Sequence, residues 1–359
     1  MKKITVLDGL RGIAVLLVLH AHLPQIGSNR LAYYIKDSAR FLYSGYIGVD
    51  IFFVLSGFLI TRILIKDKKA DDLSFKRFYL KRSLRIFPIY YLSIFLFGLF
   101  VSWKDLAPVA FYYSNYFFAV NLEPHAFRHT WSLSVEEHFY LIWPFIIYFF
   151  SLPQAKKIVL YLFPAISIAS ACFVTFTMSN EEAANFIYRG TNFRILSLAA
   201  GSYLAFIEKR LPTKTTTLFI VAATLMIALA VYERYPNGLI PVYLLQLPLF
   251  AGVSILIFLA IFSLESKTGL LRNIFTNPIL TYIGSISYGI YLYHFPILYL
   301  MGITDKDVVA PVSITKGLLA LFLCFFIPTI SFYAIEKPIL KYKDRIGKKR
   351  HAVLALTKA

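Results

Sequence analysis

Charged and histidine residues interrupt the first long apolar run of the chain. LDGLRGIAVLLVLHAH contains Arg11, His20 and His22. Arg11 and His22 are eleven residues apart, which on an α-helix is three turns plus about 20°, with about 16 Å of rise. Both side chains therefore point the same way, while His20 faces nearly opposite. His22 is a candidate general base because imidazole titrates near neutral pH. Arg11 snorkelling to lipid phosphate and His22 at the interface would also explain the pair.

Asp50 lies early in the second apolar run, GVDIFFVLSGFLIT. If this run returns through the same layer in the opposite direction, Asp50 comes to a depth comparable with that of His22. A carboxylate bound to one imidazole nitrogen fixes the tautomer and leaves the other nitrogen as a base. We therefore expect Asp50 to orient His22. The alternative is that Asp50 caps the start of its helix at the interface.

Two arginines stand together at the start of the third apolar run, FKRFYLKRSLRIFPIYY. Arg82 and Arg85 are three residues apart and share one helix face. Guanidinium groups bind phosphate oxygens bidentately, so this pair suits a polyanion. Anchoring of the helix by positive charge on the cytoplasmic side is the alternative.

A fourth polar motif, HTWSLSVEEHFYLIWP, opens another apolar run. Within about ten residues it contains His129, Trp131, Ser132, Glu136, Glu137 and His138. Glu136 and Glu137 continue directly into FYLIWPFIIYFF, where an unpaired carboxylate would be costly. We expect this segment on the outer side of the membrane. An exposed loop would account for His129 alone.

Further polar residues give weaker indications. Arg194, Tyr288 and His294 lie in later apolar runs, and each alone is more often a packing or capping residue than a catalytic one. Cys172 and Cys324 also lie in apolar runs and are expected to act as small apolar residues rather than as a disulfide or metal pair. We expect no metal site.

The elements that carry these residues are predicted to be transmembrane helices. Hydrophobic residues form 58% of the 359 positions and the mean hydropathy is +0.66, whereas soluble domains are nearer 45–50% apolar. Runs long enough to cross about 30 Å of hydrocarbon lie near 5–23, 45–65, 84–102, 131–151, 157–177, 193–208, 216–232, 242–264, 281–301 and 314–335. This predicts an all-α integral membrane bundle of about ten transmembrane helices. The short aromatic segment 105–120 is expected to be interfacial or re-entrant.

The net charge of +18 does not indicate nucleic acid binding. Lys and Arg concentrate in alternate loops, beginning with Lys2 and Lys3, so the positive-inside rule predicts that both termini are cytoplasmic. No Gly, Ser or Pro-rich linker divides the chain. We therefore expect one transmembrane domain over 1–340 and a basic cytoplasmic tail over 341–359. The first run lacks a small-residue cleavage site, so no cleaved signal peptide is expected.

Together these motifs resemble the acyltransferase 3 family, bacterial integral-membrane O-acyltransferases that modify extracytoplasmic glycans. The resemblance rests on LDGLRGIAVLLVLHAH, GVDIFFVLSGFLIT, RSLR with the following Pro88 and Tyr90, HTWSLSVEEHFYLIWP, ISYGIYLYHFP and IEKP. It implies a catalytic histidine at His22 and the family's first-span arginine at Arg11. Members often have Gln at the position of His138, which lies outside the acidic pair. It also implies a multi-pass protein of the bacterial cytoplasmic (inner) membrane.

The resemblance implies transfer of an acyl group, commonly acetyl from acetyl-CoA, to a sugar hydroxyl. With the residue spacing, it suggests that the CoA phosphates dock against Arg11, Arg82 and Arg85 while the thioester reaches His22. His22, oriented by Asp50, would then act as the base or carry the acetyl group itself. No permanently bound cofactor is expected, because acyl-CoA is a substrate.

The acceptor is expected to be a carbohydrate such as O-antigen, exopolysaccharide or another surface glycan. Glu137 is assigned to the catalytic group. Residues assigned to the acceptor side or to structure are His129, Trp131, Ser132, Glu136, Arg194, Tyr288 and His294. Many family members carry a C-terminal SGNH-type domain that is absent here, so a stand-alone enzyme with a possible separate periplasmic or extracellular partner is expected.

The alternative function is a transporter or flippase of a glycan or lipid-linked intermediate, since it too needs charges within the membrane. That function would place the charges near the midplane. The predicted division into an inner basic set and an outer set of histidines and carboxylates favours an enzyme with two substrates.

Overall fold

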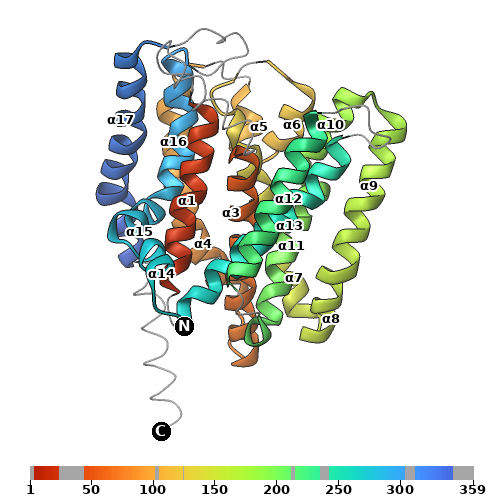
Figure 1. Ribbon diagram of the computed structural model, residues 1–359. Coiled ribbons are helices and arrows are strands. Elements are labelled where there is room, and N and C mark those ends of the chain that lie inside the picture. Colours follow the sequence, from red (N-terminus) through yellow and green to blue (C-terminus); the bar gives the residue numbers. More distant parts are fainter. Residues whose placement is uncertain are drawn as a thin grey trace.

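The computed structural model describes residues 4–23, 44–101, 105–123, 125–211, 215–234, 242–303 and 312–342. Every regular element of this part is a helix, as expected. The long helices run up and down along one common direction, and α1 begins at the lower end of the bundle (Figure 1). They are α1 (Thr5–His22), α3 (Ser44–Lys69), α4 (Phe75–Gly98), α7 (Trp131–Phe149), α9 (Phe163–Thr177), α11 (Thr191–Phe206), α12 (Thr215–Arg234), α13 (Val242–Phe262), α16 (Ser287–Leu300) and α17 (Ile314–Ser331).

Each of the predicted apolar runs overlaps one of these helices. Five described helical stretches are long and apolar enough to cross a membrane by length and composition, namely Thr5–His22, Gly45–Lys69, Leu152–Thr177, Pro248–Ser266 and Ile314–Tyr342. The helical membrane bundle is thus established, while the number of ten crossings and the side of the termini stay predictions. Most of the predicted tail, 343–359, lies outside the described residues.

The aromatic segment 105–120 folds into two short helices. α5 (Leu106–Ala110) has five residues and α6 (Ser114–Val120) has seven. At 1.5 Å per residue they reach about 7 and 10 Å, far less than the hydrocarbon thickness. The segment therefore does not cross the membrane as one helix.

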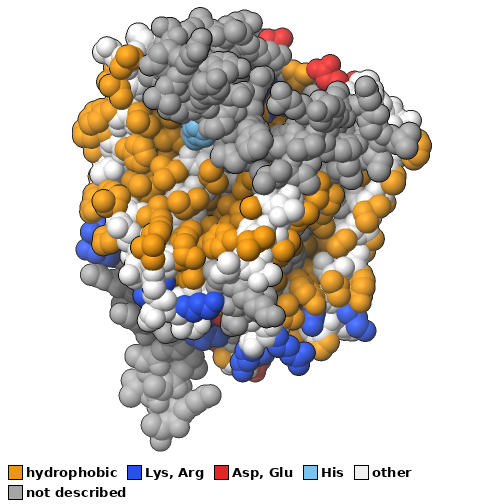
Figure 2. All heavy atoms as spheres, in the orientation of Figure 1, with side chains coloured by type: hydrophobic (Ala, Val, Ile, Leu, Met, Phe, Trp, Pro, Cys, Tyr) orange, Lys and Arg blue, Asp and Glu red, His pale blue; other side chains and the backbone are white. Residues whose placement is uncertain are grey.

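The surface also fits a membrane protein. Figure 2 shows a broad band of hydrophobic side chains across the middle of the visible face, while Lys and Arg gather at the lower end. Phe95, Phe176 and Phe322 are among many large apolar side chains that are more than half exposed. In water such a surface would be unfavourable, whereas lipid tails solvate it.

Helices α3 and α11 approach each other closely because two glycines face each other across them. A Cβ atom on Gly57 would clash with the carbonyl oxygen of Leu198, and one on Gly201 would clash with that of Val54. Small residues allow membrane helices to bring their backbones into contact. This contact brings two charged residues together across 144 positions of sequence separation.

Helix α1 lies inside the bundle and runs antiparallel to α3. A Cβ on Gly48 near the start of α3 would lie 2.6 Å from the carbonyl oxygen of Ala14, and one on Gly45 would lie 2.9 Å from the Cβ of Ala21. On another side α1 contacts the short helix α15 (Pro278–Ser285) and the adjoining α16. Two polar residues of α1, Arg11 and His22, face other helices of the protein.

Candidate active site

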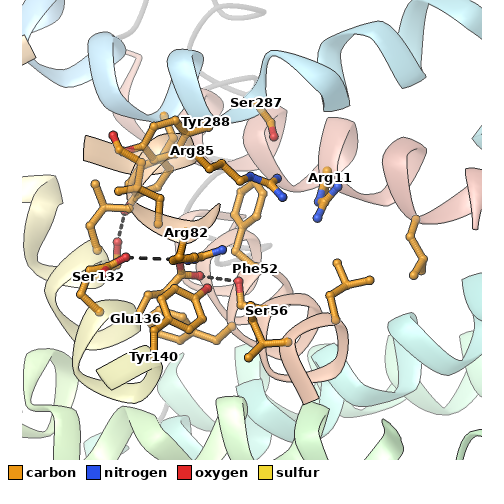
Figure 3. Close-up of a pocket in the computed structure, with 18 of the residues that line it drawn as sticks. Arg11, Phe52, Ser56, Arg82, Arg85, Ser132, Glu136, Tyr140, Ser287 and Tyr288 are labelled. Carbon is orange, nitrogen blue, oxygen red and sulfur yellow. Dashed lines mark hydrogen bonds and ion pairs between the residues drawn. The ribbon is translucent and has the colours of Figure 1, made fainter. Parts of the chain in front are cut away.

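A cavity of about 370 Å³ opens among α1, α3, α4, α7 and α16 (Figure 3). Its polar lining includes Asp8, Arg11, Ser56, Arg62, Arg82, Arg85, Ser132, Glu136, Glu137, Tyr140, Ser287, Tyr288 and Tyr291. The remaining walls are apolar, with Phe52, Leu59 and Ile86 among them. A cavity of this size that combines apolar walls with converging polar groups is typical of a ligand site.

The three arginines predicted to bind an anion all line this cavity. Arg11 forms an ion pair with Asp8 at 3.1 Å, one helical turn earlier. Arg85 points toward Arg11 in Figure 3. Arg85 lies inside the bundle yet is exposed, because its surface faces this cavity and a smaller neighbouring one. Among the described residues Arg85 forms no ion pair, so its charge is available to a ligand.

Arg82 differs from Arg85 because α7 surrounds it with partners. Its guanidinium lies 3.9 Å from Glu136 and 4.0 Å from Glu137. It also stacks on the ring of Tyr140 at 3.5 Å. Ser56 donates a hydrogen bond of 2.7 Å to Glu136. The charge of Arg82 is thus largely compensated within the protein.

This arrangement corrects the expected position of Glu136 and Glu137. Sequence placed the pair beside the histidines on the outer side, yet both carboxylates share a cavity with the arginines. The reason is the position of the two carboxylates along α7. Glu136 comes five residues after the start of α7, about 8 Å down the helix, where it meets Arg82 rising on α4.

The expected pair of His22 and Asp50 is also not formed. Asp50 is completely buried and accepts hydrogen bonds from Arg194 Nη2 at 2.9 Å and from Ser197 Oγ at 2.5 Å. Arg194 is only 1% exposed, and its guanidinium lies 5.5 Å from the ring of Trp131. Asp50, Arg194 and Trp131 therefore form a sealed structural unit between α3, α11 and α7.

Three histidines gather at the other end of α1. His294 Nε2 lies 3.3 Å from His22 Nδ1, and the ring centroids of His294 and His129 are 5.2 Å apart. His129 is buried and its Nε2 donates to the carbonyl oxygen of Leu292 at 3.1 Å. From sequence, His129 and His294 were assigned only to the acceptor side or to structure. The feature that could have grouped them is that His22 and His294 are imidazoles within apolar runs and His129 lies two residues before one.

One hydroxyl pair separates the cavity from this histidine cluster. Ser132 and Tyr291 both line the cavity and share a hydrogen bond of 2.5 Å. The Tyr291 hydroxyl also donates to the backbone oxygen of His129 at 3.1 Å. The Tyr291 ring lies 5.6 Å from that of His129 and from that of His294. Tyr291 was not singled out from sequence, because it is one of several aromatic residues in ISYGIYLYHFP and nothing in that segment distinguishes it from the others.

The remaining predicted residue, Tyr288, lines the cavity and donates to the carbonyl oxygen of Ile86 at 3.3 Å. In the described part of the chain no group of histidine, cysteine or carboxylate side chains has an arrangement that could hold a metal ion. The described site thus combines an arginine cavity, a hydroxyl wall and an imidazole cluster. These groups can bind an anion at one end and exchange a proton at the other.

Comparison with known proteins identifies the family of this chain. The family model described as an acyltransferase domain, the acyltransferase 3 model, matches residues 4–335. The peptidoglycan O-acetyltransferase OatA of Listeria monocytogenes is 31% identical over 95% of this chain and 56% of its own length. YrhL of Bacillus subtilis, provisionally named a peptidoglycan O-acetyltransferase, is 30% identical over 93% of this chain and 54% of its own length.

A provisionally named O-acetyltransferase of Staphylococcus aureus is 28% identical over 95% of this chain and 58% of its own length. The chain thus spans little more than half the length of these relatives. No solved structure matches it. Because the match covers almost all of the sequence and includes every motif described above except most of IEKP (335–338), the chain belongs to the acyltransferase 3 family.

Proposed function

We propose that this protein is a membrane O-acyltransferase that moves an acetyl group from cytoplasmic acyl-CoA to a hydroxyl of an extracytoplasmic glycan. The observation that carries the proposal is the guanidinium of Arg85, which forms no ion pair within the described part of the chain and faces Arg11 in a cavity that ends against the histidine cluster. An anion bound there would project its tail toward imidazoles. Peptidoglycan is the first acceptor to test because the Listeria relative is named for it.

The distribution of basic residues supports entry of the donor from the cytoplasm. Lys66, Lys68 and Lys69 end α3, and Lys156 and Lys157 end α8 (Leu152–Lys157), at the lower end where α1 begins. By the positive-inside rule this end would be cytoplasmic. The cavity is lined by residues from the first turns of α1. The proposed location is therefore the bacterial inner membrane, with multiple crossings and both termini inside.

The distance along α1 suits a long, narrow donor. Arg11 and His22 are separated by about 16 Å of helix, which is of the order that an extended pantetheine arm covers. Phosphates held by Arg11 and Arg85 would leave the thioester near the wall formed by Ser132 and Tyr291. We infer that this hydroxyl pair separates when the acyl group passes to His22.

His22 would then supply the chemistry. As the acceptor oxygen attacks the thioester carbonyl, its proton passes to His22. The carbon–sulfur bond then breaks, and the sulfur takes that proton from His22 and leaves as the free thiol of CoA. Alternatively His22 Nε2 attacks the thioester first, the carbon–sulfur bond breaks and the thiolate leaves. The acceptor hydroxyl then attacks the acetyl-imidazolium, the carbon–nitrogen bond breaks, and the hydroxyl proton passes to the thiolate. In both routes Glu137 acts at a distance, by compensating the charge of Arg82.

The experiment uses the purified chain in lipid nanodiscs with acetyl-CoA labelled in the acetyl group and soluble peptidoglycan fragments. We expect label in the glycan with the wild-type protein and with the control His20→Ala, and none with His22→Ala. Transfer by a folded His22→Ala protein would disprove the role of His22. Movement of labelled glycan across a bilayer without chemistry would favour a flippase instead.

A further inference from the structure

His294 is the buried imidazole that contacts the proposed catalytic histidine. It lies on α16, is 1% exposed, and packs its ring 5.1 Å from that of His22. The two residues are 272 positions apart in sequence. Phe295 lies 5.1 Å from the His22 ring and 5.3 Å from the His129 ring, so the cluster is enclosed by aromatic contacts.

The hydrogen bonds of His294 determine which of its nitrogens carries the proton. Its Nδ1 lies 2.6 Å from the carbonyl oxygen of Tyr291 and 3.1 Å from that of Ile290. Carbonyl oxygens only accept hydrogen bonds, so Nδ1 must be the donor. In the neutral imidazole, Nε2 then bears the lone pair. Nε2 of His294, which bears this lone pair, lies 3.3 Å from His22 Nδ1.

The hydrogen-bond partners of His22 determine its tautomer in the same way. Its Nδ1 faces two acceptors, the lone pair of His294 and the carbonyl oxygen of Val18 at 2.9 Å. Nδ1 must therefore carry the hydrogen. The lone pair of His22 is consequently on Nε2, the nitrogen that has to accept a proton or an acyl group.

We propose that His294 is a positioning residue that, together with the carbonyl oxygen of Val18, holds His22 in the Nδ1–H tautomer and so keeps Nε2 as the reactive nitrogen. The inference rests on the proposed function. It assigns to a neutral imidazole the task that a carboxylate performs in many catalytic triads. A neutral partner suits this position, because a carboxylate without a cation beside it would carry a large desolvation cost inside an apolar bundle. Asp50, the expected partner, is already held by Arg194.

The first test compares two substitutions at one position. His294→Leu removes one of the two acceptors of His22 Nδ1–H and leaves the carbonyl oxygen of Val18 as the other. We expect kcat to fall by about tenfold or more with the KM for acetyl-CoA unchanged, since the arginine cavity is untouched. His294→Gln returns an acceptor oxygen near the position of Nε2 but cannot hold a proton, and we expect it to recover most of the loss. Both variants are checked for folding by thermal unfolding in nanodiscs, and His20→Ala is the matched histidine control.

Retained kcat in His294→Leu, or no recovery in a folded His294→Gln, would overturn the proposal. The second outcome would mean that His294 exchanges protons rather than orients its neighbour. A further measurement is independent of activity: nitrogen NMR of the protein labelled at histidine, with the His22 signals assigned by comparison with His22→Ala. We expect the Nδ1–H tautomer in the wild type and a smaller share of it in His294→Leu, where the carbonyl oxygen of Val18 is the acceptor that remains.

An Nε2–H tautomer of His22 in the wild type would refute the inference whatever the substrate is. Conversely, if the expected tautomer is found but no acetyl group is transferred, the positioning contact stands and the proposed function fails. The two failures are thus distinguishable.

Discussion

Arg194 and Arg85 both lie inside the helical bundle, and their surroundings are opposite. Arg194 is 1% exposed, bonded to Asp50 and enclosed by the rings of Phe53, Trp131 and Tyr188. Arg85 is exposed to a cavity and has no ion pair among the described residues. A buried charge whose partner is built in serves the fold, whereas one that lacks a partner and faces a cavity is prepared for a ligand.

The largest effect is expected at the paired arginine. Arg194→Leu leaves the Asp50 carboxylate buried without its cation, and breaking such a pair from one side typically costs about 3–5 kcal/mol. We expect a strongly lowered melting temperature, measured by thermal unfolding in nanodiscs. Adding Asp50→Leu to this variant should restore part of the loss, because no charge is then stranded. Wild-type stability in the single variant would contradict the structural role.

At Arg85 we expect substitution to weaken binding of acetyl-CoA and to leave stability almost unchanged. Arg85→Gln removes no ion pair of the described protein, so the melting temperature should change little. A charged hydrogen bond to a bound phosphate contributes about 1.5–3 kcal/mol, so the KM for acetyl-CoA should rise by about tenfold or more. The measurement is initial rate against acetyl-CoA concentration. Lost folding with an unchanged KM would show that Arg85 supports the structure instead.

The smallest effect is expected at Arg62, which lines the same cavity but carries its own partner. Arg62 Nε lies 2.9 Å from Glu208 Oε2, and both side chains are partly exposed, at 19% and 27%. Pairs of this kind contribute at most about 1 kcal/mol. Arg62→Gln should therefore lower stability slightly and leave the KM within about twofold. A rise as large as that of Arg85→Gln would mean that cavity position, rather than the lack of a partner, identifies the anion site.

Local sequence determined the helices and the identity of the family. Apolar runs of bilayer length predicted helices that the structure contains, because each helix satisfies its own backbone hydrogen bonds and needs no distant partner. Motifs of adjacent residues were sufficient for the resemblance that the family match establishes. Side chains that share a helix, such as Arg82 and Arg85, also reached the same cavity as expected.

Only the tertiary structure decided which polar groups meet. Because α3 and α11 approach closely at Gly57 and Gly201, Asp50 pairs with Arg194. Asp50 is therefore not the partner of His22. Glu137 joins the arginines rather than the histidines. His294, 272 positions from His22, becomes its neighbour instead. The helical repeat specifies the direction of a side chain on its own helix, but the partner depends on which helices pack together and at what depth.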